Sequence, residues 1–234
     1  MNSKNWKQVQ IQEFNKNWYL KKNRFAFLNR LNIIDRVLNR TFPDMVLDLG
    51  TGDGELLIQL ISSGRFDNLF FGIDISKSLI QIAVKLAKRN KISQSVHFLI
   101  ADAENLPFRE DIFDLITCTA VLEHVFHREL VVKEMSRVVK QKKLIIITIP
   151  NSLYHYVFRL LAFLKLRFKD SVYNPDLTIG KLEFLMVNNR LKPIFKLNFV
   201  LPIPNFLTFI EKFLIKFKIK NFHLFLNQLL ICKR

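Results

Sequence analysis

Three glycines interrupt an apolar segment close to residue 50. The string VLDLGTGDG (46–54) carries an apolar run past Asp48 and into a loop that contains Gly50, Gly52 and Gly54. Glycine has no Cβ, so such a loop can turn tightly and let a ligand approach the backbone closely. This pattern predicts a binding loop for a flat, close-fitting ligand, and a tight turn without a ligand is the alternative interpretation.

A second group able to bind a nucleoside follows at the end of the next apolar run. The string FGIDIS (71–76) places Asp74 there, with Ile75 directly after it. In ribose-binding βαβ units an acidic residue about 20 positions beyond the glycines accepts hydrogen bonds from the ribose hydroxyls. Asp74 has the position for this role, and a solvated loop aspartate is the alternative.

The spacing of the glycines differs from that of dinucleotide-binding loops, because the third glycine comes one residue early. With Asp48 before it, the loop resembles motif I of class I S-adenosylmethionine-dependent methyltransferases, in the small-molecule branch that includes quinone-biosynthesis enzymes. Further strings follow in that family's order, and the resemblance covers about residues 45–151, or extends to about residue 190. They are FGIDIS (71–76), IADAENLPF (100–108), FDLITCTAVLEHV (113–125) and IITIPN (146–151).

The resemblance implies S-adenosylmethionine as the cofactor and assigns roles to individual residues. Asp74 would hold the ribose, and Asp102 would hold the adenine amino group beside Ala103. The segment after residue 118 would lie beside the methionine moiety and face the acceptor. The expected cofactor-binding residues are Asp48, Gly50, Thr51, Gly52, Asp74, Ile75, Asp102, Ala103 and Thr119.

Methyl transfer from a sulfonium requires alignment more than catalytic side chains. An acidic acceptor also needs a base, and His124 is the best candidate because an imidazole titrates near neutral pH. A packing or capping role for His124 is equally compatible with the sequence. Some quinone-pathway relatives bind a metal here, but Ala120 stands at their first glutamate position, so Glu123 and His124 alone predict no metal site.

Apolar runs alternate with helical patterns around these motifs. We expect strands at 45–49, 69–73, 96–100, 113–118, 144–149, 191–200 and 224–232, and helices at 25–37, after Ser76, and at 179–188. Strands that alternate with helices indicate an α/β fold, and the resemblance implies a Rossmann-like, seven-stranded, mostly parallel sheet with helices on both faces. We expect an N-terminal helical cap (1–44), a cofactor-binding core (45–151) and a C-terminal part of the same domain (152–234).

The net charge of +16 lies outside the expected core. Residues 1–44 carry +6, residues 45–150 carry no net charge, and residues 151–234 carry +10. Two basic, apolar helices are predicted in the last part, at 154–168 and 206–217. Such helices can lie on an anionic membrane, or their apolar stripes can pack as ordinary core.

These features favour a small, apolar or lipid-like acceptor and leave two other functions open. Positive charge also suits an RNA methyltransferase, but no base-methylating N-P-P-Y motif or RNA-binding module is visible, so nucleic acid is the less favoured partner. A non-catalytic cofactor-binding protein is the other alternative. Two distant cysteines, Cys118 and Cys232, and a polar N-terminus predict a cytoplasmic protein, with peripheral membrane attachment as an open question.

Overall fold

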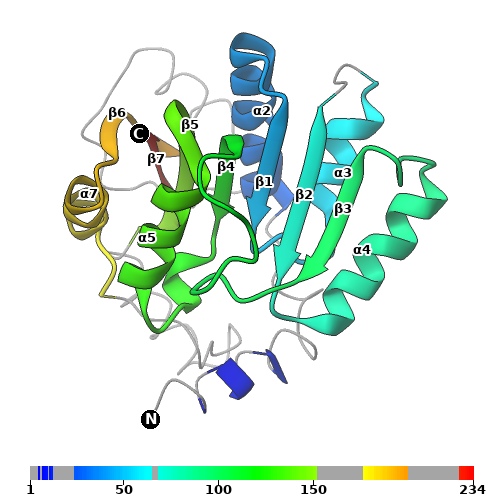
Figure 1. Cartoon of the computed structure of the whole chain (residues 1–234), viewed down its shortest axis with the longest axis horizontal. Helices are drawn as coiled ribbons and strands as arrows, with labels where there is room; N and C mark the ends of the chain where they lie inside the picture. Colours follow the sequence, from blue (N-terminus) through cyan, green and yellow to red (C-terminus); the bar gives the residue numbers. More distant parts are fainter. Residues whose placement is uncertain are drawn as a thin grey trace.

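Seven strands form one sheet in the computed structural model, which describes residues 24–64, 68–151, 176–199 and 227–234, with residues 5, 7–9, 11 and 12. The strand order is β3-β2-β1-β4-β5-β7-β6 (Figure 1). β1 to β5 are mutually parallel, and β7 is antiparallel to both β5 and β6. The strands are β1 Met45–Leu49, β2 Leu69–Asp74, β3 Val96–Ile100, β4 Phe113–Thr119, β5 Val139–Pro150, β6 Lys192–Phe199 and β7 Asn227–Lys233.

Helices cover both faces of this sheet. Leu38, Leu57 and Ala87 of α2, α3 and α4 belong to the buried cluster on one face. Met135 of α5 and Met186 of α7 belong to the cluster on the other face. The Rossmann-like architecture expected from the sequence is therefore confirmed. The helices are α2 Arg24–Thr41, α3 Glu55–Ser62, α4 Lys77–Arg89, the 3-10 turn η1 Leu122–His124, α5 Arg128–Val138 and α7 Ile179–Asn188.

Burial on both faces explains why the central strands are rich in apolar residues. In β4, six consecutive residues from Phe113 to Cys118 are buried. A strand that is covered by helices on both sides loses the alternation of polar and apolar residues. The sequence therefore located β4 through a mostly apolar run between loop signals, although Asp114 and Thr117 also lie in the strand.

Local signals also fixed the start of α4. The Ser76 hydroxyl accepts a hydrogen bond from the backbone N–H of Leu79 at 3.3 Å, as expected of an N-cap. Leu79, Ala83 and Ala87 lie on the buried face of the helix. The predicted cap and helix are both confirmed.

The predicted bounds of β5 were too narrow at the N-terminal side. The strand begins at Val139 instead of Leu144. Its first residues include Lys140 and Lys143, which both pair with the Asp114 carboxylate. The ammonium groups lie 3.1 and 3.0 Å from that carboxylate. A basic stretch stabilised by a distant carboxylate has no apolar pattern that could reveal a strand.

Two predicted features of the C-terminal part lie outside the described residues, namely the basic helices at 154–168 and 206–217. The last strand begins within the described part at Asn227 and ends one residue later than predicted, at Lys233. Among the helices that the structure describes, none is long and apolar enough to cross a membrane.

Candidate cofactor and acceptor site

The predicted binding residues meet where the strand order reverses. β1 pairs with β2 on one side and with β4 on the other, so the connections that leave β1 and β4 run to opposite sides of the sheet. In open α/β sheets ligands bind in the crevice at the carboxyl ends of the strands at such a point. Gly50 follows β1 there, Asp74 ends β2, and Thr119 ends β4.

The glycine loop is held to the neighbouring strand by its backbone. The N–H groups of Gly50 and Thr51 both donate to the carbonyl oxygen of Ile73, at 2.9 and 2.8 Å. Gly50, Gly52 and Gly54 have φ angles of +73°, +60° and +74°, a region that L side chains rarely adopt. The loop is therefore a fixed, tightly turned cradle.

The Asp74 carboxylate fixes the same loop through its two oxygens. Oδ2 accepts from the backbone N–H of Gly52 at 3.0 Å, and Oδ1 accepts from that of Ser76 at 2.8 Å. Burial raises the pKa of Asp74, and these backbone hydrogen bonds oppose the shift. Each carboxylate oxygen can accept a further hydrogen bond, so Asp74 can position the loop and still receive ribose hydroxyls.

Asp48 lies beneath the loop, buried at 2% exposure. Its Oδ1 accepts from the Thr117 hydroxyl at 2.6 Å. Burial raises the pKa of Asp48 to about 6, and the hydrogen bond from Thr117 opposes the shift. Its observed contact therefore supports the junction of β1 and β4.

The loop after β3 lies next to Asp74. The N–H of Ala101 donates to the Asp74 carbonyl at 3.1 Å, and Asp102 and Ala103 follow, both half-buried. The N–H of Glu104 donates to Asp102 Oδ1 at 3.0 Å. The structure thus places the two carboxylates expected to bind ribose and adenine on adjacent strand ends.

Two residues of α5 fix the far part of this loop. The Arg137 guanidinium donates to the carbonyls of Leu106 and Phe108 at 3.1 and 2.7 Å. Glu134 accepts from the N–H of Leu106 at 2.8 Å and pairs with Arg137 at 2.7 Å. Hydrogen bonding to Arg137 lowers the pKa of Glu134, so the pair is charged at neutral pH.

The segment after β4 closes the other side of the crevice. Ala120 has a φ of +57°, and its N–H donates to the Thr148 carbonyl at 3.0 Å. This sharp turn brings Val121 against Gly50 and starts η1, which ends at the half-buried His124. His124 is therefore close to the glycine loop, on the side where the resemblance places the acceptor.

Sequence reasoning missed Arg30, a basic residue near the buried carboxylates. It occupies the same stripe of α2 as the buried Ala26, Ile34 and Leu38. Burial lowers the pKa of Arg30, and the charges of Glu123 and Asp48 oppose that shift. The available signal was a cation at a core position of an amphipathic helix.

Lys7 was also missed, and nothing in its sequence context distinguishes it. Its ammonium lies 2.6 Å from Asp102 Oδ2 and 2.7 Å from Glu104 Oε2. Asp53 and Glu55 lie just before and in the first turn of α3, where the helix dipole favours negative charge. No group of three metal-ligating side chains is found within the described ranges.

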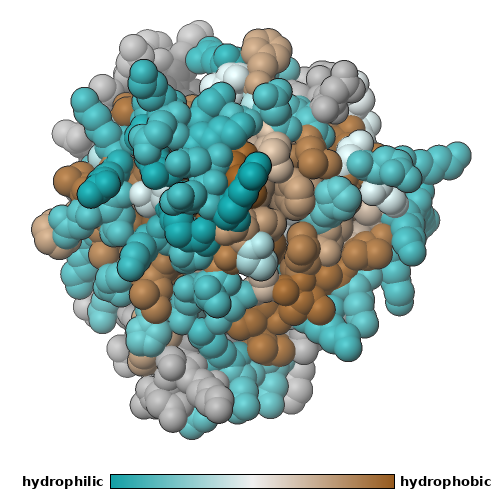
Figure 2. All heavy atoms as spheres, viewed as in Figure 1, coloured by the Kyte–Doolittle hydropathy of each residue, from teal (hydrophilic) through white to brown (hydrophobic). Residues whose placement is uncertain are grey.

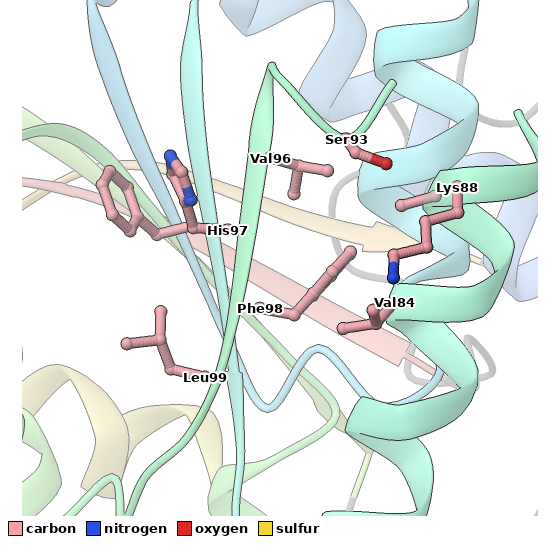
Figure 3. A pocket seen from close by; sticks show the side chains of 9 residues that line it. Val84, Lys88, Ser93, Val96, His97, Phe98 and Leu99 are labelled. Atoms are coloured by element: carbon pink, nitrogen blue, oxygen red, sulfur yellow. The ribbon is translucent and has the colours of Figure 1, made fainter. Parts of the chain in front are cut away.

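A separate hollow of about 520 Å³ lies on the outer edge of β3, beside α4 (Figure 3). Val84 and Lys88 line it from the helix, and Val96, His97 and Phe98 line it from the strand. None of the predicted cofactor-binding residues lines this hollow. It is therefore distinct from the crevice at the strand ends.

The site residues fit the adenosine part of S-adenosylmethionine. A Cβ on Gly72 would come within 2.9 Å of Thr51 Oγ1 and 2.7 Å of Phe98, so the backbone under the loop has no room for larger residues. Half-buried carboxylates at two adjacent strand ends supply acceptors for hydroxyl and amino donors. Asp74 and Asp102 would hold the ribose and the adenine.

Sequence comparisons agree with this geometry. The model of a family described as "Methyltransferase domain" matches residues 44–195. The uncharacterised methyltransferase YcgJ of Bacillus subtilis (strain 168) is 32% identical over 96 residues, which are 41% of this chain and 36% of that protein. The ubiquinone/menaquinone biosynthesis C-methyltransferase UbiE of Vibrio campbellii is 34% identical over 95 residues, 41% of this chain and 37% of UbiE. In these sequence alignments the chain spans little more than a third of each relative's length.

Solved structures share the fold over most of the chain. The crystal structure of Bacillus subtilis YcgJ superposes with a TM-score of 0.64 at 22% sequence identity. The match covers 87% of this chain and 97% of the YcgJ chain. Geranyl diphosphate C-methyltransferase from Streptomyces coelicolor A3(2) has a TM-score of 0.59 at 19% identity, covering 82% of this chain and 71% of its own. The chain belongs to the methyltransferase domain family and has the Rossmann-like fold of solved methyltransferases, one of which, a geranyl diphosphate methyltransferase, was determined in complex with S-adenosylmethionine.

Proposed function

We propose that this chain transfers the methyl group of S-adenosylmethionine to a small, apolar or lipid-like acceptor. The observation that carries the proposal is the placement of Asp74 and Asp102 on adjacent strand ends beside the left-handed glycine loop. This arrangement supplies a backbone cradle together with two acceptors for the ribose and the adenine. It lies at the strand-order reversal, where such folds bind their ligands.

The bound cofactor supplies an electrophilic methyl group on a sulfonium. Transfer of that methyl group to the acceptor would leave the thioether S-adenosylhomocysteine, and an acidic acceptor would also lose a proton. The Gly50–Gly54 loop and Asp74 would orient the nucleoside, which fixes the line of attack. His124, at the end of η1, would receive the proton from the acceptor.

Apolar side chains next to η1 support an apolar acceptor. Phe126 and Leu130 follow His124 in the chain and are 40% and 43% exposed. UbiE acts in ubiquinone and menaquinone biosynthesis, and a structural neighbour methylates geranyl diphosphate, whose hydrocarbon chain carries a charged diphosphate, so some relatives on this fold act on molecules with large apolar parts. The +10 charge of residues 151–234 further suits an acceptor presented at an anionic membrane surface by a cytoplasmic enzyme.

Calorimetric titration with S-adenosylmethionine and S-adenosylhomocysteine tests the cofactor site. The parent should bind both, and Asp74→Ala should bind at least about tenfold more weakly, since the loop and the ribose both lose an acceptor. Asp44→Ala is the matched control, because this exposed carboxyl group lies at the opposite end of β1. Failure of the folded parent to bind either molecule would overturn the proposal.

Transfer of a labelled methyl group then tests the acceptor. The parent would be supplied with prenylated quinone precursors in anionic vesicles, with total RNA, or with neither. Label in the lipid extract supports the proposal, whereas label in RNA replaces it with the nucleic-acid alternative. Cofactor binding without transfer to any acceptor would favour a non-catalytic binding protein.

A further inference from the structure

Lys7 joins the N-terminal residues to the loop expected to contact adenine. Its Nζ lies 2.6 Å from Asp102 Oδ2 and 2.7 Å from Glu104 Oε2. Residues 5, 7–9, 11 and 12 are helical and lie below the C-terminal ends of the strands in Figure 1. Contacts over 95 and 97 residues of sequence separation cannot arise from local helix formation. They fix where this stretch lies on the core.

Glu104 extends the contact to the acceptor side of the crevice. Its Oε2 binds Lys7, while its Oε1 accepts from the backbone N–H of His127 at 3.3 Å. The Glu104 side chain is only 9% exposed, so its pairing with Lys7 is partly shielded from solvent. Lys7 and the backbone of His127 therefore meet at the Glu104 carboxylate, next to Asp102.

Lys7 does not exhaust the acceptor capacity of Asp102. Oδ2 takes the ammonium and Oδ1 takes the N–H of Glu104. A carboxylate has about four acceptor positions, so the adenine amino group can bind while Lys7 stays in place.

We propose that Lys7 is a positioning residue, which fastens the N-terminal segment over the adenine end of the cofactor site and so slows cofactor release. The inference rests on the proposed role of Asp102. Lys7 holds the segment by two charges at once, so removal of either contact should loosen it. The methyl-transfer step takes place at the other end of the cofactor and should not depend on Lys7.

Stopped-flow measurement of S-adenosylhomocysteine dissociation tests this on the full-length protein. Lys7→Met and Glu104→Gln should each release the ligand about twofold to fivefold faster, the size expected of a partly exposed ion pair. The double variant should be no faster than the quicker single variant, because both substitutions break one shared contact. Lys85→Met, an exposed lysine of α4, is the control for loss of one positive charge.

Hydrogen exchange without cofactor gives a second readout. Backbone exchange at residues 5–12 should rise in Lys7→Met and in Glu104→Gln and stay unchanged in Lys85→Met. If the parent binds ligand and Lys7→Met releases it at the same rate or more slowly, this inference alone is overturned. If the parent binds no ligand, the proposed function fails together with it.

Discussion

Gly50 and Val121 are in contact across the crevice between β1 and β4, with no space between them for another carbon atom. A Cβ placed on Gly50 would come 2.3 Å from Val121 Cγ2. The segment after β4 therefore packs directly against the glycine loop. Because His124 lies three residues beyond Val121, this contact also positions the candidate base relative to the cofactor loop.

Substitution of Gly50 should damage both the loop and the segment seated on it. Gly50→Ala should lower the free energy of unfolding by about 1–3 kcal/mol, since it adds both a clash and strain at a positive φ angle. Adding Val121→Ala to Gly50→Ala should restore only part of the lost free energy of unfolding. The second substitution removes the clash but leaves the backbone strain at residue 50. Denaturant unfolding of the single and double variants measures both effects, and a fully stable Gly50→Ala would contradict the observed contact.

Arg137 should stabilise the adenine loop from α5. Arg137→Ala removes donors to two loop carbonyls and the partner of Glu134, so we expect a loss of about 1–3 kcal/mol in unfolding free energy. Exchange of the Leu106 N–H should also accelerate, because Glu134 loses the guanidinium that orients it. Arg109→Ala, an exposed arginine of the same loop, should leave both measurements unchanged.

Asp48 should make stability fall as pH rises. Burial raises its pKa from the ordinary aspartate value of 3.8 to about 6, so the folded protein binds the proton more tightly than the unfolded chain does. Between about pH 4 and pH 6 this group should remove up to about 3 kcal/mol of unfolding free energy. Asp48→Asn cannot ionise, so its stability relative to the parent should rise over this window. A pH-independent difference would show that Asp48 titrates normally.

His124 should affect turnover more than cofactor binding. If it accepts the acceptor's proton, His124→Gln should lower kcat by about a hundredfold or more while calorimetry shows an unchanged affinity for S-adenosylmethionine. Parallel loss of affinity and thermal stability would instead identify His124 as a packing residue. His97→Gln, an exposed histidine on β3, is the control.

An aromatic cluster connects the adenine loop to the sheet. Hydrophobic side chains reach the surface over β2 and β3 in Figure 2, on the face where Figure 1 shows no helix in front of these strands. Phe71, Phe108 and the fully buried Phe113 pack edge to face with one another, with ring centroids 4.9 to 5.8 Å apart. The loop that Arg137 fixes thus supplies Phe108 to this aromatic cluster, which links adenine-loop order to the stability of the sheet.

The sequence by itself determined the features that depend on neighbouring residues. Apolar runs located the strands, Ser76 marked the start of α4, and the glycine spacing placed the loop between β1 and α3. Backbone preferences and periodic burial act over a few residues, so they can be read without the fold. The positions of Asp74 and Asp102 at strand ends followed from the same signals.

Only the tertiary structure decided which distant groups meet. The pairing of Lys7 with Asp102, the approach of Arg30 to Asp48 and Glu123, and the extension of β5 by lysines that bind Asp114 all join residues far apart in the chain. Charges leave no periodic pattern when their partners come from other elements. The free energy of burying or pairing a charge depends on which groups the fold places beside it. Those neighbours come from distant parts of the chain, so only the packing of the elements decides them.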